Sequence, residues 1–482
     1  MVIALVHTPS NPITAVVIAL LLFGVSRPII HRVARAEGSP WLVRILTISL
    51  ILHLLAAPAQ IFVVDHFYKG VADWLRYDNQ GSILAPSFRH LDFTLAHANV
   101  RGIVNDGSVS IAAGIVMAIV GVNQLGAFLV FAWLSFLGAI MFYRAFTLTF
   151  PAAQAGHRRY ALMLFFLPSL IFWTADVSKE AIMALSLGVT AYGASKVLIR
   201  RKGGFAMLVL GIAIGILVRP NELLVVLGGF AVALMIRPAG VGVNRSGLKR
   251  VGSLVFMALL LGLSIFFTLH YLHSSAGSLS LTQVAKNQSG TGAGFGSSGV
   301  PYSASPLTYW RDVYTILLDP LPITAHGTGQ LISSLENTMI LGLILFSLRQ
   351  LRIVPRAAFA RPYVMMCVVY SLGFIYAFAA LGNLGLITRE RTLLFPFLLV
   401  LLCIPRTPKR RAPAYQWELK RRARKNFRAP GAHPAARGVN VRGRPPVSQA
   451  SVAAERSPYE VPEDPPLAPT TPVGGLNDPP PD

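Results

Sequence analysis

Three charged side chains interrupt an otherwise apolar stretch of the sequence, IFWTADVSKEAIMALSLGV at positions 171–189. They are Asp176, Lys179 and Glu180, and they fall within five positions. A carboxylate can act as a general base or pair with a cation, and an ammonium group can hold a phosphate. Ionisable residues at membrane depth are costly and often functional. One interpretation is therefore that these side chains line an aqueous cavity at a membrane surface.

The same three residues also suit an ordinary helix start. Asp176 would cap a helix that begins near Val177, and Glu180 in the first turn would favour the positive end of the helix dipole. Asp176 and Lys179, three positions apart, would then form an ion pair. The sequence leaves the structural and the functional interpretation open.

Two further charged corners are expected on the same side as this stretch. In LVRPNELL, positions 217–224, Pro220 ends one helix and opens the next, so that Arg219 lies at a hairpin. In ITRERTLLFPFLL, positions 387–399, Arg389 and Arg391 precede a last apolar run. Arginine is suited to bidentate phosphate contacts, and arginines on an outer face run against the positive-inside bias. We expect these three arginines to contact an anionic group such as a lipid diphosphate.

A fourth piece is VVDHFYKGVADWLRYD at positions 63–78. Asp65 follows directly on a hydrophobic run, and Tyr68 comes within one helical turn of it. Asp65 is either a simple helix-end residue or a carboxylate that removes a proton from a sugar hydroxyl at the membrane surface. In the second interpretation Tyr68 lies beside the substrate.

The elements that must position these residues follow from the composition. The mean hydropathy of the 482 residues is +0.57, and only 13% are charged, about half of the fraction in soluble proteins. Long apolar runs recur over the first 404 residues. Backbone polar groups must be satisfied inside a bilayer, so these runs predict an all-α, polytopic transmembrane helical bundle.

Basic loops predict the topology. They place about eleven spans in a plasma membrane, with the N-terminus outside and the C-terminus cytoplasmic. The region 107–148 fits this alternation only if the short, glycine-punctuated stretch Val109–Val122 is a re-entrant segment. The predicted organisation is a multi-pass domain over 1–404, with external loops at 65–106 and 274–335, and a disordered cytoplasmic tail over 405–482.

The formal net charge of +23 does not predict nucleic-acid binding. Much of the excess lies in short loops and in the first half of the tail, where anionic lipid headgroups are the expected partners. The two cysteines, Cys367 and Cys403, lie inside apolar runs and predict no disulfide framework. No histidine or cysteine spacing indicates a metal site.

Several of these pieces, in this order, resemble bacterial membrane proteins of envelope polysaccharide assembly. The segments are Asp65 with Tyr68, LSFLGAIMFYRAF (134–146), LPSLIFWTADVSKEA (167–181), VRPN (218–221) and GLITRERTLLFP (385–396). They are similar to those of lipid-linked glycosyltransferases of the GT-C type and of Wzy- or EpsG-like polysaccharide polymerases. The resemblance covers roughly residues 60–404. Ala175 and Asp176 depart from it, since Ser-Gly is frequent there.

The resemblance implies a membrane glycosyltransferase or polymerase that uses a polyprenyl-phosphate-linked sugar. It implies Asp65 as the catalytic base and Arg219, Arg389 and Arg391 as phosphate contacts. Lys179 and Glu180 would line the acceptor cavity. Some members of the GT-C type use a divalent metal, but no ligand pattern predicts one here. A flippase of lipid-linked sugars and a non-catalytic scaffold of an envelope-assembly complex remain the alternative functions.

Overall fold

Helices make up the regular structure of the part of the chain that the computed structural model describes. These residues are 10–67, 72–100, 102–151, 153–237, 309–325, 328–378 and 384–405, with three isolated positions between 255 and 262. No strand occurs among them. The predicted all-α class is therefore confirmed. The predicted tail beyond residue 405 and the first part of the predicted loop 274–335 lie outside the described residues.

Four helices are long and apolar enough to cross a membrane. They are α1 (Pro12–Ala36), α2 (Trp41–Phe67), α5 (Gln124–Thr149) and α8 (Lys179–Leu198). The shortest has 20 residues, which at about 1.5 Å per residue spans roughly the 30 Å of a bilayer core. The chain therefore has the make-up of a membrane protein, and the count of about eleven spans remains a prediction.

The other described helices are shorter. They are α3 (Trp74–Arg89), η1 (Leu95–Ala98), α4 (Asp106–Val120), α6 (Gln154–Phe166), α7 (Pro168–Phe172), α9 (Gly204–Val218), α10 (Pro220–Met235), α13 (Tyr309–Leu318), α14 (Thr328–Phe346), α15 (Leu348–Leu351), α16 (Val354–Ala360), α17 (Pro362–Phe378), α18 (Leu384–Glu390), η4 (Arg391–Leu393) and α19 (Phe395–Leu402). Pro220 is the first residue of α10, as the hairpin prediction requires.

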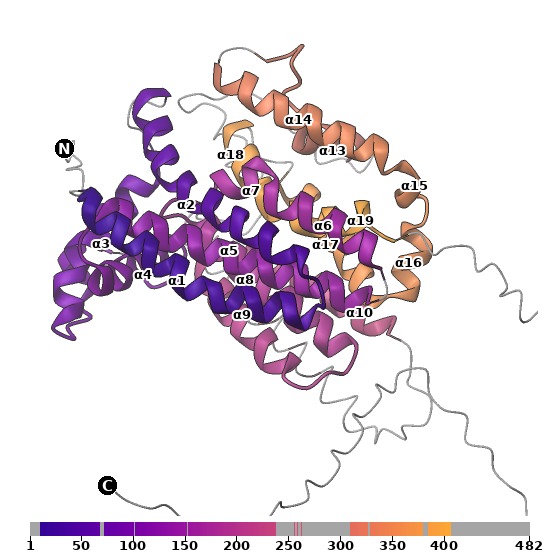
Figure 1. Ribbon diagram of the computed structural model, residues 1–482, viewed down its shortest axis with the longest axis horizontal. Helices are drawn as coiled ribbons and strands as arrows, with labels where there is room; N and C mark the ends of the chain where they lie inside the picture. Colours follow the sequence, from indigo (N-terminus) through magenta and orange to yellow (C-terminus); the bar gives the residue numbers. More distant parts are fainter. Residues whose placement is uncertain are drawn as a thin grey trace, which may run out of the picture. The chain divides into compact units, whose positions relative to one another are not determined.

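Glycines bring α5 and α8 into close contact. A Cβ atom on Gly138 would lie 2.3 Å from the carbonyl oxygen of Ala184, and one on Gly188 would lie 2.3 Å from that of Gly138. Arg144 lies over the ring of Tyr192, 4.7 Å from its centroid, so the two helices run in the same direction. Small residues at such crossings let backbones approach closely. In Figure 1, α5 and α8 lie side by side, with α9 next to them.

Aromatic side chains fix α6 against α5 in the opposite direction. Phe146 stacks on Tyr160, with 4.3 Å between the ring centroids, and Phe136 packs near Phe165. The hydroxyl group of Tyr160 donates to the carbonyl oxygen of Pro396 at 2.9 Å. The start of α6 therefore lies beside the end of α5, far from the start of α8.

The short helix α3 lies within the predicted external loop 65–106, and the short helix α4 begins at the end of that loop and covers most of the stretch Val109–Val122. A Cβ atom on Gly81 of α3 would lie 2.6 Å from Cβ of Ala113 of α4, so the two helices touch. The 15 residues of α4 span about 22 Å, less than a bilayer core. The re-entrant interpretation of Val109–Val122 remains a prediction.

Candidate functional site

A buried network of ion pairs joins helix ends that are far apart in the sequence. Arg219, between α9 and α10, donates from Nη2 to Glu180 Oε1 at 2.6 Å and from Nη1 to Glu222 Oε1 at 2.5 Å. The same Nη1 pairs with Glu390 at the end of α18. The side chains of Glu180 and Glu222 are fully buried. One guanidinium therefore binds three carboxylates from three segments.

A second arginine extends this network to the surface. Arg389 donates from Nη2 to the other oxygen of Glu180 at 2.7 Å and from Nη1 to Asp73 Oδ2 at 3.0 Å. The side chain of Asp73 is 62% exposed, and that of Arg389 is 15% exposed. Glu180 is thus held by two arginines, and a continuous chain of ion pairs leads from the interior to solvent.

Asp106, the first residue of α4, is the centre of a second charged group. Lys179 Nζ lies 2.5 Å from Asp106 Oδ1, the hydroxyl of Tyr77 donates to the same oxygen at 2.9 Å, and Arg76 pairs with the other oxygen. Burial alone would raise the pKa of Asp106, but the neighbouring Lys179, Arg76 and Tyr77 lower it to about 2. Asp106 is therefore an anchor for cations and a weak candidate for a general base.

The arginine network contains more carboxylates than guanidiniums. Asp73, Glu180, Glu222 and Glu390 pair with only Arg219 and Arg389. Two of the three arginines predicted to contact phosphate, Arg219 and Arg389, therefore have protein carboxylates as partners. Within the two charged groups, the cations nearest to solvent are Arg389, Lys179 and Arg76, with side chains that are 15%, 16% and 52% exposed. An anionic ligand would reach these three first.

The predicted local contacts of Asp176 are wrong. Ser178, not Asp176, caps α8, with its hydroxyl oxygen 3.4 Å from the backbone nitrogen of Ala181. Lys179 pairs with Asp106, because the chain turns between positions 176 and 179. Asp176 is 4% exposed and accepts a hydrogen bond from Gln60 Nε2 of α2 at 3.3 Å. Glu180 does lie in the first helical turn, as predicted.

Burial raises the pKa of Asp176 to about 6, against the opposing effect of Arg389. In the unfolded chain the group ionises near its ordinary pKa of 3.8. Between these values the folded state holds a proton that the unfolded state releases, so the stability from this group falls as pH rises from about 4 to about 6 and then stays low.

Asp176→Asn should remove this dependence and raise the unfolding free energy at neutral pH by up to about 3 kcal/mol. The measurement is the thermal unfolding midpoint of wild type and variant in detergent across that pH range. A difference between the two proteins that does not change with pH would contradict the assignment.

Arg391 lies apart from the ion-pair network. It is fully buried in η4 and donates from Nη2 to Asn337 Oδ1 at 2.5 Å and from Nη1 to the carbonyl oxygen of Ile316 at 3.3 Å. These contacts tie η4 to α13 and α14. The predicted phosphate contact of Arg391 is untested, but its partners are protein groups.

The structure describes Asp65 but not Tyr68, the two residues of the predicted catalytic segment. Asp65 lies in the last turn of α2 with an exposed side chain, and no ion pair or side-chain hydrogen bond joins it to another described residue. Tyr68 lies outside the described residues. The catalytic role of Asp65 and the substrate contact of Tyr68 remain predictions.

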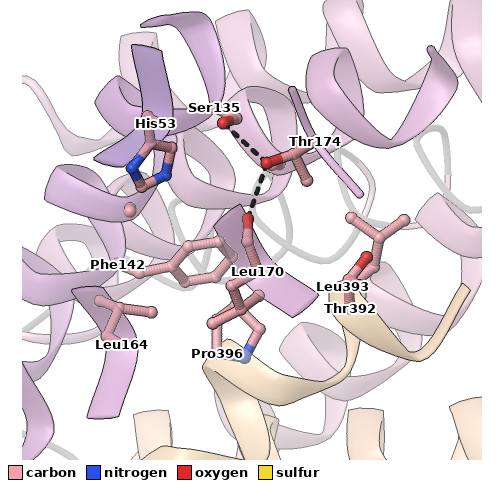
Figure 2. A pocket seen from close by; sticks show the side chains of 11 residues that line it. His53, Ser135, Phe142, Leu164, Leu170, Thr174, Thr392, Leu393 and Pro396 are labelled. Carbon is pink, nitrogen blue, oxygen red and sulfur yellow. Dashed lines mark hydrogen bonds between the residues drawn. The ribbon is translucent and has the colours of Figure 1, made fainter. Parts of the chain in front are cut away.

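A small cavity with mostly apolar walls lies among α2, α5 and the segment that leads to Asp176 (Figure 2). Its volume of about 20 Å³ suffices for about one water molecule. Thr174 Oγ1 donates to the carbonyl oxygen of Leu170 at 2.7 Å and lies 2.9 Å from Ser135 Oγ, and His53 also lines the cavity. His53 is buried, with Nδ1 2.8 Å from the carbonyl oxygen of Ser49.

Some residues of the site carried no clear signal in the sequence. Asp73, Arg76 and Asp106 lie in or at the border of a polar stretch with mixed charge, which is typical of a loop. Their role depends on α3 and α4 packing beside the start of α8. The one feature of the sequence that could have indicated Asp106 is its charge directly before a short apolar run.

Among the described residues, no group of three or more histidine, cysteine or acidic side chains is placed to hold a metal ion. Compared with models of protein families, with curated proteins and with solved structures, the chain gives no match. The resemblance to enzymes of envelope polysaccharide assembly therefore rests on the motif residues themselves.

Proposed function

We propose that the chain is an integral membrane enzyme that transfers or polymerises sugars from a polyprenyl-phosphate-linked donor. The observation that supports this most is the meeting of three motif segments in one network. Glu180 of the VSKE segment bonds directly to both Arg219 of the VRPN segment and Arg389 of the TRER segment. Segments that carry a shared site are expected to converge in this way.

In this proposal, some of the charged residues position the helices and others contact the donor. The buried pairs of Arg219 with Glu180 and Glu222 position the helix ends. Arg389, with Lys179 and Arg76 of the second group, offers cationic side chains to a phosphate. In the reaction, a sugar hydroxyl oxygen attacks the anomeric carbon of the donor, and the bond from that carbon to the phosphate oxygen breaks. A carboxylate takes the hydroxyl proton, and the cations stabilise the departing phosphate.

The topology of the proposal follows the positive-inside bias. About eleven spans cross the plasma membrane, with the N-terminus and the charged groups on the outer face. The C-terminus is cytoplasmic, and the basic half of a disordered tail lies along anionic lipids. The donor is then a lipid-linked sugar in the outer leaflet.

Lys179→Gln tests the proposal in the native host without the wild-type copy. The variant removes a cation but leaves the arginine network intact. At normal membrane abundance, we expect a surface glycan to be lost and its lipid-linked precursor to accumulate on the outer leaflet. Arg201→Gln, at an exposed residue after the other end of α8, is the control and should behave as wild type. Unchanged glycans in the Lys179 variant would count against the enzyme.

A flippase is the second candidate, because transporters place polar sites deep in the membrane. The buried polar side chains of His53 and Ser135, within the membrane-length helices α2 and α5, favour this alternative. The same experiment separates the two functions. A precursor that accumulates on the cytoplasmic leaflet would indicate transport.

A further inference from the structure

An open groove runs between α6 and α14, away from the ion-pair network. Its volume is about 590 Å³, within the range of about 300–1,000 Å³ of ligand pockets. Its walls are apolar and include Leu162, Phe166, Met339 and Leu343. Leu162 and Met339 are 45% and 40% exposed. In a membrane protein, such a groove is open to lipid chains.

Charge is confined to one end of the groove. Arg158 and Arg159 belong to the first turns of α6, and both line the groove. Nη2 of Arg159 donates to Ser347 Oγ at 2.5 Å, so the arginines lie where α6 begins and α14 ends. The backbone N–H of Ser169, just beyond α6, donates to Oε1 of Glu336 in α14 at 3.1 Å. The two helices therefore run in opposite directions, with the cationic end at Arg158.

The two arginines differ in their availability. Arg159 is held by Ser347, which fixes its guanidinium at the edge of the groove. Arg158 is exposed, and within the described ranges no carboxylate or carbonyl group pairs with its side chain. An arginine without a protein partner beside an apolar groove is complementary to a phosphate attached to a hydrocarbon chain.

We infer that this groove binds an anionic glycerophospholipid, with one acyl chain between α6 and α14 and the phosphate at Arg158 and Arg159. The cationic end of the groove lies at the end of the helices opposite to the charged groups, since α6 starts beside the end of α5. The bound lipid therefore belongs to the leaflet opposite to the one that supplies the proposed sugar donor. The position in that leaflet favours a resident phospholipid over a polyprenyl phosphate substrate.

The test uses the full chain, reconstituted in nanodiscs that contain equal amounts of phosphatidylcholine and phosphatidylglycerol. After extraction into detergent, native mass spectrometry measures how much phosphatidylglycerol remains bound. Arg158→Gln should lower the retained phosphatidylglycerol about fivefold, the effect of one basic residue on an anionic lipid. Leu343→Trp, which fills the apolar part, should lower retention of both lipids. Arg158 is exposed, so its replacement should leave folding intact.

Arg201→Gln is the matched control, because Arg201 is exposed but does not line the groove. Equal losses in the Arg158 and Arg201 variants would overturn the inference, since they would indicate general attraction of anionic lipid. Retention of both lipids in the Leu343 variant at the wild-type level would do the same. A polyprenyl phosphate copurifying in the groove in place of phosphatidylglycerol would also refute it. None of these outcomes depends on sugar transfer, so the inference and the proposed function can fail separately.

Discussion

Arg219→Met is expected to lower the free energy of unfolding by about 3–5 kcal/mol, the cost of removing one partner from a buried ion pair. The methionine keeps much of the side-chain volume but leaves three carboxylates without their shared guanidinium: Glu180, Glu222 and Glu390. Glu180 keeps Arg389, whereas Glu222 is fully buried and one of its oxygens already lacks a partner in the described part of the chain. Unfolding of purified protein in detergent, followed by tryptophan fluorescence, measures the loss.

A double variant tests whether the unpaired charges cause this loss. Glu222→Gln in the Arg219→Met background removes the buried carboxyl group that has lost its guanidinium partner, and it should restore part of the lost stability. If the charges are the cause, the two substitutions are not additive, since their side chains are in contact. Arg201→Met at an exposed position should leave stability nearly unchanged. A double variant that is less stable than Arg219→Met alone would show that loss of packing dominates.

The helices were predictable because their signals are local. Apolar runs of sufficient length and Pro220 after Arg219 indicate helices and a hairpin without knowledge of the partners. The segment around Tyr309–Leu318 likewise alternates at helical spacing, and it forms α13 with Ile316 and Leu317 buried. The helix within the stretch 65–106 was less predictable, because the polar composition of this stretch is typical of a loop. The helix α3 nevertheless forms there, with Trp74 and Tyr77 buried.

The pairing within the site was not predictable from spacing. Asp176 and Lys179 are close in sequence, yet Lys179 pairs with Asp106 and Asp176 lies beside Gln60. Spacing in the sequence predicts pairs within one helix. Here the packing of α3 and α4 beside α8 supplies the partner of Lys179. The three motif segments were expected on one side of the membrane. Their direct contacts could only come from the fold.

Asp73→Asn is expected to slow sugar transfer by about 10²–10⁴-fold, the usual contribution of a general base. Asp73 is the accessible carboxylate of the network, 62% exposed and 3.0 Å from Arg389, a cation that would hold the phosphate. Asp65 has no such neighbour among the described residues. An exposed ion pair contributes only about 0–1 kcal/mol, so folding should change little.

The measurement is the rate of glycan extension by isolated membranes, with the lipid-linked precursor from the Lys179→Gln strain as substrate. Asp65→Asn, prepared at the same membrane abundance, is the comparison. If Asp65→Asn abolishes transfer and Asp73→Asn does not, the base is at the end of α2, and Asp73 only orients Arg389. If both variants transfer sugar at the wild-type rate, neither carboxylate takes the proton. The transfer itself would then be intact, and the assignment of the general base to Asp73 or Asp65 would be refuted.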